Sequence, residues 1–223
     1  MATFLVIPAA GSGTRLRHNG PKALVPILGH SILSWTLEAF AGQTFDRAVI
    51  AAPADRMRDF ERVVKGRAAL VAGGVTRSAS VRAAFQALGA CGADVVCIHD
   101  AARPLISAEE IGRVLEAARA TGAATAATPI VDTVKRVESE RIVATIDREG
   151  LYAAGTPQAF RADLLARAFD TGREATDEAG LLEILGVPVR AVPVSRWNIK
   201  ITTPEDLELV EALLRRRGRG VAS

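Results

Sequence analysis

FLVIPAAGSGTRLRHNGPKAL, residues 4–24, places a glycine-rich and basic segment directly after a short apolar run. The apolar run predicts a buried β-strand, and the glycines allow backbone N–H groups to approach an anion closely. A following helix N-terminus would add its dipole, while Arg15 and Lys22 add formal positive charge. The segment therefore predicts a strand followed by a loop that binds a phosphorylated ligand.

Two well-known phosphate-binding loops do not fit this segment. A dinucleotide fingerprint has the pattern G-x-G-x-x-G, whereas Gly11 and Gly13 are followed by Leu16 at the third glycine position. No acidic residue closes the next predicted strand at 49–52, so a nicotinamide cofactor is disfavoured. A Walker-type loop ends in Gly-Lys-Ser/Thr, but Lys22 lies in a separate second turn. An ordinary strand-to-helix turn with exposed basic side chains remains the alternative interpretation.

Composition favours one large α/β domain. The chain has 223 residues, of which 49% are hydrophobic and 24% charged, enough to bury a substantial core. No apolar run approaches the ~20 residues of a membrane span, and no basic region precedes a long apolar stretch at the N-terminus. We therefore expect a cytoplasmic protein without membrane contact. The arginine-rich segment 215–219 has no aromatic platform, so we interpret it as a solvated helix end and expect no nucleic-acid partner.

Short apolar segments alternate with helical patterns along the chain. Strands are predicted at 3–7, 47–52, 68–72, 94–98, 123–128 and 189–194. Helices are predicted at 31–41, 55–65, 77–89, 107–121, 161–171, 177–185 and 204–216. Ser107 and Glu110 have the spacing of a capping box at the start of one of these helices. This alternation is typical of an α/β fold with a mainly parallel sheet flanked by helices.

One segment interrupts the alternation. Residues 134–137 and 142–146 flank a polar turn and predict an inserted β-hairpin. A lone hairpin cannot bury both of its faces, so it needs a neighbour. Either the hairpin folds back on its own domain, or it is an arm that reaches a second subunit.

Residues that follow the predicted strands are rich in small and basic side chains. Ligands of open α/β sheets bind beyond the carboxyl ends of the strands. The segments there are AAGSGTRL at 9–16, GGVTRSASV at 73–81 and HDAARP at 99–104, with TPQ at 156–158 after the hairpin. Asp100 is the only obvious carboxylate at a strand end, and Mg²⁺ is typically held by one or two carboxylates plus substrate oxygens. We expect a magnesium ligand at Asp100, the alternative being a turn or helix-cap aspartate.

Taken together, these motifs resemble those of the 2-C-methyl-D-erythritol 4-phosphate cytidylyltransferase family. In chain order they are PAAGSGTRL with PKAL, GGVTRSASV, HDAARP, DTVKR, TPQAF, TDEAG and NIKITTPEDL, within residues 8–207. Each motif alone is weak, but their shared order over nearly the whole chain is specific.

The resemblance implies a Rossmann-like nucleotidyltransferase fold. Residues 1–223 would form a single domain, with 134–146 as a protruding dimerisation arm of a homodimer. The implied reaction transfers CMP from CTP to 2-C-methyl-D-erythritol 4-phosphate and releases pyrophosphate, in the non-mevalonate isoprenoid pathway. CTP would be the co-substrate, methylerythritol phosphate the acceptor and Mg²⁺ the cofactor.

The resemblance also implies roles for individual residues. The catalytic cations would be Arg15, Lys22 and Lys200. The backbone cradle for the triphosphate would be Ala9, Ala10, Gly11 and Gly13. Cytosine and its loop would involve Gly74, Arg77 and Ser80. The sugar phosphate would bind Thr133 and Arg148, the metal would bind Asp100, and Arg103 and Thr156 match further substrate-side positions.

The implied chemistry needs no general base. The attacking group is a phosphate monoester oxygen that is already anionic at neutral pH, so no histidine has to be catalytic. Positioning and electrostatics would do most of the work, since two polyanions have to meet in line at the α-phosphorus.

Three other functions compete with this interpretation. Ribitol-5-phosphate cytidylyltransferase shares the CTP motifs, but Arg148 and the DTVKR pattern favour methylerythritol phosphate. A catalytically silent nucleotide sensor would not need Lys22, Asp100 and Lys200, and a dinucleotide oxidoreductase lacks its fingerprint. One position departs from the family, which usually has glutamine where this chain has Gly155.

Overall fold

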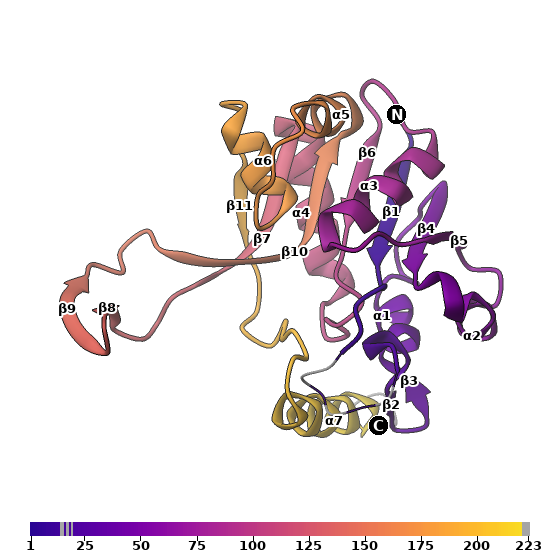
Figure 1. Ribbon diagram of the computed structural model, residues 1–223, viewed down its shortest axis with the longest axis horizontal. Coiled ribbons are helices and arrows are strands. Elements are labelled where there is room, and N and C mark those ends of the chain that lie inside the picture. The colour runs from indigo at the N-terminus through magenta and orange to yellow at the C-terminus, as the bar shows by residue number, and fades with distance from the viewer. Residues whose placement is uncertain (14–15, 17, 19, 220–223) are drawn as a thin grey trace.

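A central seven-stranded sheet organises the chain in the computed structural model (Figure 1), which describes all residues except 14, 15, 17, 19 and 220–223. The strand order is β11-β7-β10-β6-β1-β4-β5. These strands are β1 (Thr3–Pro8), β4 (Arg47–Ala52), β5 (Ala69–Ala72), β6 (Val95–Ile98), β7 (Ala123–Pro129), β10 (Tyr152–Arg161) and β11 (Arg190–Pro193). Only β10 runs antiparallel to its neighbours, so the predicted mainly parallel sheet is confirmed.

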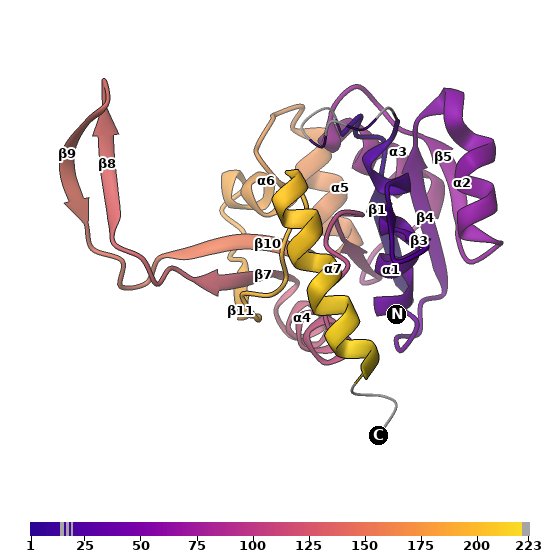
Figure 2. The same ribbon diagram turned by 90° about the horizontal axis from the view of Figure 1, so that it is seen from below.

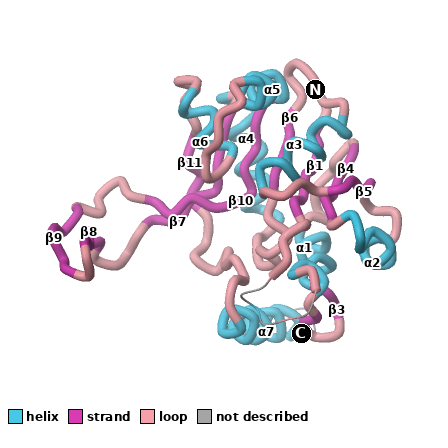
Figure 3. The backbone as a smooth tube through the Cα atoms, viewed as in Figure 1, coloured by secondary structure: helices cyan, strands magenta, loops and turns pink. Residues whose placement is uncertain are grey.

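Helices cover both faces of this sheet (Figure 3). The described α-helices are α1 (Ile32–Ala39), α2 (Met57–Val64), α3 (Arg77–Leu88), α4 (Ala108–Thr121), α5 (Ala162–Asp170), α6 (Glu178–Ile184) and α7 (Pro204–Arg219). Two small antiparallel pairs lie outside the sheet: β2 (Pro26–Ile27) with β3 (His30–Ser31), and β8 (Val134–Glu138) with β9 (Arg141–Ile146). All seven predicted helices are present.

The core follows from the two-residue period of the strands. In β1, Leu5 and Ile7 pack with α1, α2 and α4 on one face, whereas Val6 packs with α3, α5 and α6 on the other. A separate apolar cluster joins α7 to the β2–β3 hairpin. Both faces of the sheet are therefore covered, which explains the near-continuous apolar sequence of its central strands.

The predicted hairpin is present as β8 and β9, and it projects from the body as an arm. Figures 1 and 2 show it separated from the domain in two perpendicular views. Within the described part of the chain its strands pair only with each other, and Val137, Ile142 and Val143 are exposed. Within one chain, therefore, the hairpin does not fold back on its own domain.

The segment TPQ at 156–158 does follow the hairpin, but its predicted position beyond the end of a strand is wrong. These residues lie inside β10, between β6 and β7, where the register shifts between Ala154 and Gln158. This strand was not predicted because YAAGTPQAF contains a glycine and a proline, and both residues are unfavourable in the middle of a sheet. The shift accommodates them without ending the strand.

No helix in the described part of the chain is long and apolar enough to cross a membrane.

Candidate active site

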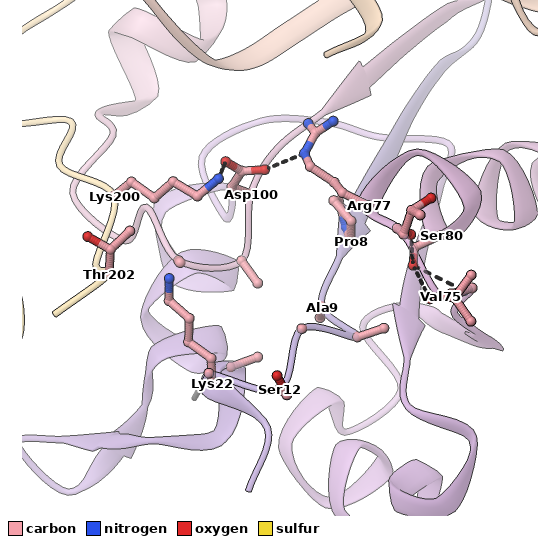
Figure 4. A pocket seen from close by; sticks show the side chains of 18 residues that line it. Pro8, Ala9, Ser12, Lys22, Val75, Arg77, Ser80, Asp100, Lys200 and Thr202 are labelled. Atoms are coloured by element: carbon pink, nitrogen blue, oxygen red, sulfur yellow. Dashed lines mark hydrogen bonds and ion pairs between the residues drawn. The ribbon is translucent and has the colours of Figure 1, made fainter. Parts of the chain in front are cut away.

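A pocket of about 350 Å³ lies where β1, β5 and β6 end (Figure 4). Because these strands are parallel, their carboxyl ends meet at one edge of the sheet. Three loops and one distant segment line the pocket: Pro8–Gly13, Gly74–Ser80, Asp100–Ala102, and Lys200 with Thr202. Lys22 and Ala23 complete the lining from the second turn of the opening motif. The three loops follow the predicted strands at 3–7, 68–72 and 94–98.

The opening loop is compact because of Gly13. This glycine has φ +68, and a Cβ on it would lie 2.7 Å from Cβ of Lys22. The Lys22 N–H donates to the carbonyl of Gly11 at 3.3 Å, which brings the lysine back over the loop. A larger residue at position 13 would be strained and would displace Lys22.

None of the described α-helices directly follows this loop. The first α-helix begins at Ile32, and Lys22–Leu24 is a short 3₁₀ helix. A helix N-terminus does reach the pocket, but it belongs to α3, whose first residue is Arg77 and whose cap is Thr76. The tertiary fold thus supplies this feature from another part of the chain.

Ser80 organises the loop that precedes α3. Its hydroxyl accepts from the Gly74 N–H at 3.1 Å and donates to the Thr76 carbonyl at 3.0 Å. Gly73 packs against the opening loop, where an added Cβ would lie 2.4 Å from Cβ of Ala10. The two loops are therefore in contact through backbone and small side chains.

Replacing Gly73 with alanine should disturb both loops at once. The new methyl group would overlap Ala10 and crowd the Ser80 hydroxyl, so we expect activity at subsaturating nucleotide to fall about tenfold, with a stability loss of about 1–3 kcal/mol. Steady-state kinetics and urea unfolding would measure the two effects. Adding Ala10→Gly should recover part of the activity, because it removes the overlapping methyl group. Unchanged kinetics in Gly73→Ala would show that the two loops are not coupled.

Asp100 is the centre of a buried cluster of charges. Its Oδ1 accepts from Arg77 Nε at 2.9 Å, and its Oδ2 lies 2.7 Å from Lys200 Nζ and 3.6 Å from Arg103 Nε. The Asp100 side chain is only 9% exposed. Arg77 in turn contacts Glu178, so the cluster contains three cations and two carboxylates. Its net positive charge suits a polyanionic ligand.

The pKa of Asp100 lies well below its usual range. Burial would raise this pKa, but the positive charges and hydrogen bonds of Arg77 and Lys200 outweigh that effect. Burial would lower the pKa of Arg77, but the charges of Glu178 and Asp100 outweigh that effect and raise this pKa. The Asp100 carboxylate is therefore ionised at neutral pH.

Backbone contacts bring Lys200 to Asp100. The Ile201 N–H donates to the carbonyl of Ala102 at 2.9 Å, which fixes the segment before α7 against the segment after β6. Thr156 of β10 links the same two segments. The Asp100 N–H donates to Thr156 Oγ1 at 3.0 Å, and Asn198 Nδ2 donates to the Thr156 carbonyl at 2.8 Å. In Figure 4 the side chains of Lys22 and Lys200 extend toward the same space.

His99 is a structural neighbour of this cluster. Its ring is fully buried, contacts Phe40 with 4.9 Å between ring centroids, and donates from Nε2 to the carbonyl of Arg103 at 3.0 Å. Burial lowers the pKa of His99 to about 4. The ring is therefore neutral at physiological pH and helps to shape the segment that carries Asp100.

The buried ring should make stability depend on pH. Between pH 6.5 and about 4 the unfolded chain binds a proton at His99 that the folded chain does not, so stability falls as the pH decreases through this window. We expect His99 to contribute a loss of about 3 kcal/mol. Urea unfolding at several pH values would show this slope, and His99→Gln should reduce it. Equal slopes in both proteins would contradict the expectation.

Comparison with known proteins identifies the family. The sequence model of the 2-C-methyl-D-erythritol 4-phosphate cytidylyltransferase family matches residues 3–216. The chain belongs to this family. A 2-C-methyl-D-erythritol 4-phosphate cytidylyltransferase of Deinococcus radiodurans is 47% identical over 215 residues, 95% of this chain and 89% of that protein. One of Acidobacterium capsulatum is 41% identical, covering 97% of this chain and 99% of its own length. The crystal structure of the Thermus thermophilus enzyme of this name has a TM-score of 0.79 at 36% identity, over 96% of this chain and 100% of that chain.

The fold brings most of the residues expected for this family to one place. The described pocket is lined by Ala9, Ala10, Gly11, Gly13, Lys22, Gly74, Arg77, Ser80, Asp100 and Lys200. Arg103 and Thr156 lie directly behind it, in contact with Asp100. Arg15 lies outside the described residues, so its position stays a prediction.

Thr133 and Arg148 are not brought to this pocket by their own chain. Both are exposed and flank the arm, and Arg148 donates to the carbonyl of Val131 across its base. Neither residue is among those that line the pocket. The predicted acceptor site is therefore not assembled within one described chain.

The lack of a side chain at Gly155 leaves space for the Arg103 guanidinium. A Cβ at this position would lie 3.3 Å from Cζ of Arg103, so the guanidinium packs against the strand backbone of β10. Arg103 Nη1 donates to the carbonyl of Asn198 at 2.7 Å, and burial lowers the Arg103 pKa. A glutamine at this position would have to displace this guanidinium.

Two residues that hold the site together were not predicted from the sequence. Asn198 joins the segment after β11 to β10, and Glu178 holds Arg77. Both lie in motifs that carried the resemblance, NIKITTPEDL and TDEAG, but nothing in these motifs indicates which distant residue each would contact.

Proposed function

We propose that the chain transfers the cytidylyl group of CTP to 2-C-methyl-D-erythritol 4-phosphate and releases pyrophosphate, the reaction named for its family. The observation that carries this proposal is the pocket itself. It combines a backbone loop at Ala9–Gly13 with Lys22, Lys200 and Arg77 around a single carboxylate among its described lining residues. Such a surface suits a triphosphate ester, and the pKa of its one described carboxylate lies well below the usual range, which makes Asp100 a poor general base.

The transfer is a displacement at the α-phosphorus. An anionic oxygen of the acceptor phosphate attacks, a new phosphorus–oxygen bond forms, and the bond to the bridging oxygen of pyrophosphate breaks. Lys22 and Lys200 would balance the charge that develops on the phosphoryl oxygens, and the loop N–H groups would hold the triphosphate in line. The acceptor oxygen needs no deprotonation, which fits the neutral, buried His99.

Asp100 is suited to hold Mg²⁺ together with ligand oxygens. No group of three or more histidine, cysteine or acidic side chains in the described part of the chain could bind a metal by itself. One ionised carboxylate facing a phosphate pocket matches the usual way in which Mg²⁺ is bound, by one or two carboxylates plus substrate oxygens. A bound Mg²⁺ would neutralise phosphate oxygens of the nucleotide.

The arm supports a homodimer. A two-stranded hairpin is marginal without a partner, and Val137, Ile142 and Val143 leave apolar surface on it. If the arm packs on a second copy, Thr133 and Arg148 at its ends would serve the acceptor site of that copy. A cytoplasmic location stays a prediction.

Pyrophosphate release from each nucleoside triphosphate, with methylerythritol phosphate or ribitol 5-phosphate as acceptor, would test the proposal. We expect turnover with CTP and methylerythritol phosphate, because the Gly73–Ser80 loop packs against the Ala9–Gly13 loop at Ala10 and should therefore leave little room for a purine. Comparable turnover with ATP would contradict the base assignment. Preference for ribitol 5-phosphate would contradict the acceptor assignment.

A further inference from the structure

Glu178 is a buried carboxylate to which the transfer reaction assigns no task. It is the first residue of α6, and its side chain is 1% exposed. Arg77 Nη1 donates to both of its oxygens, at 2.7 Å and 3.0 Å. The two residues are 101 positions apart in the sequence, so this contact depends on where the tertiary fold places the first residues of α3 and α6.

Arg77 is held between two carboxylates. Its Nη1 is bound by Glu178, and its Nε donates to Asp100 Oδ1 at 2.9 Å. A guanidinium is planar, so anchoring one nitrogen restricts the direction in which the Nε–H can point. Glu178 therefore determines where Arg77 meets Asp100.

The charge balance adds a second effect. Burying the guanidinium is costly unless a carboxylate compensates its charge, and Glu178 provides that compensation outside the pocket lining. Asp100 is then free to interact with Lys200 at 2.7 Å as well. Without Glu178, Arg77 would depend on Asp100 alone.

Glu178 is itself held rigidly. Neighbouring Asp177 caps α6 through the Gly180 N–H at 2.9 Å and accepts from Gln158 Nε2 at 2.7 Å. Gln158 Oε1 accepts from the Ala179 N–H at 3.3 Å. The start of α6 is thus fixed to β10, in the middle of the sheet.

From these contacts we propose that Glu178 is a positioning residue for the transfer reaction, holding Arg77 and, through it, Asp100 in the reactive geometry. The proposal rests on the proposed function of the pocket. A merely structural ion pair would contribute to stability and leave the turnover of the folded enzyme unchanged.

Glu178→Gln tests this directly, because it keeps the size of the side chain and removes its charge. We expect kcat to fall about tenfold or more, with a smaller change in KM for the acceptor. Glu183→Gln, the same exchange at an exposed position of α6, is the matched control and should leave kcat unchanged. Wild-type kcat in folded Glu178→Gln would overturn the proposal.

A double-mutant cycle identifies the route. If Glu178 acts through Arg77, adding Glu178→Gln to an Arg77→Gln enzyme should change kcat less than about twofold. A further tenfold loss in that background would overturn the proposal.

Glu178→Asp is the second variant, should Glu178→Gln fail to fold. Aspartate keeps the charge, but its shorter side chain places the carboxylate farther from Arg77 Nη1, so we expect a several-fold loss of kcat. Full kcat in Glu178→Asp would overturn the proposal in that case.

One readout does not depend on turnover. The ¹⁵N–¹H signal of Arg77 Nε, assigned by its loss in Arg77→Gln, should be protected from exchange in the wild type and shifted or lost in Glu178→Gln. An unchanged signal would overturn the proposal even if the wild type proved inactive with CTP and methylerythritol phosphate. That inactivity would instead count against the proposed function.

Discussion

Asp100→Asn should lower kcat by about two orders of magnitude or more, equivalent to roughly 3 kcal/mol of transition-state stabilisation. The substitution removes the negative charge that Arg77 and Lys200 contact directly, at 2.9 Å and 2.7 Å. It also removes the carboxylate proposed to hold Mg²⁺. KM for CTP should change less, since the lost negative charge leaves the pocket more attractive to a triphosphate. Pyrophosphate release at saturating Mg²⁺ measures both constants.

The control for this experiment is Asp163→Asn. Asp163 is an ion-paired aspartate on the surface, in contact with Arg161, and its loss should leave kcat unchanged. Thermal unfolding of both variants would separate catalytic from structural loss, because a buried charge cluster that loses its central carboxylate is destabilised. Near-normal turnover of Asp100→Asn at saturating Mg²⁺ would remove Asp100 from the catalytic centre.

Mixed dimers should recover activity that neither parent has. Lys22 lines the pocket of its own chain, whereas Arg148 lies at the base of the arm and is not among the residues that line that pocket. If the arm serves the other subunit, Lys22→Ala and Arg148→Ala homodimers would both be inactive. A dimer with one subunit of each kind would carry both lesions in one site and neither in the other. We expect up to about half of wild-type activity per mixed dimer.

The experiment needs heterodimers that have been verified, for example by two different affinity tags. Arg148→Lys supplies a related test, because lysine keeps the charge and loses the forked geometry that fits a phosphate. It should raise KM for methylerythritol phosphate much more than KM for CTP. No recovery in verified mixed dimers would show that Arg148 serves its own subunit or that the arm is not exchanged.

Local patterns were sufficient for most elements of the fold. The alternation of apolar strands and helical periods predicted six strands of the sheet and its seven helices, and the hairpin formed where its two apolar runs flank a polar turn. The capping box at Ser107 and Glu110 is present with both of its hydrogen bonds. β10 was missed because its glycine and proline contradict strand propensity, and only pairing on both sides with β6 and β7 makes it a strand.

The site, like the fold, has features that local sequence predicts and features that depend on tertiary contacts. The sequence by itself determined which loops meet at the pocket, since strands in parallel pairs end at one edge and each loop follows its strand directly. Only the tertiary structure decided that Lys200 faces Asp100, that Arg77 is shared by Asp100 and Glu178, and that the arm leaves its own domain. The physical reason is the separation in sequence between the residues that interact. Caps, turns and strand periods depend on residues a few positions apart, whereas a buried ion pair forms between segments that backbone contacts such as Ile201 to Ala102 bring together from distant parts of the chain.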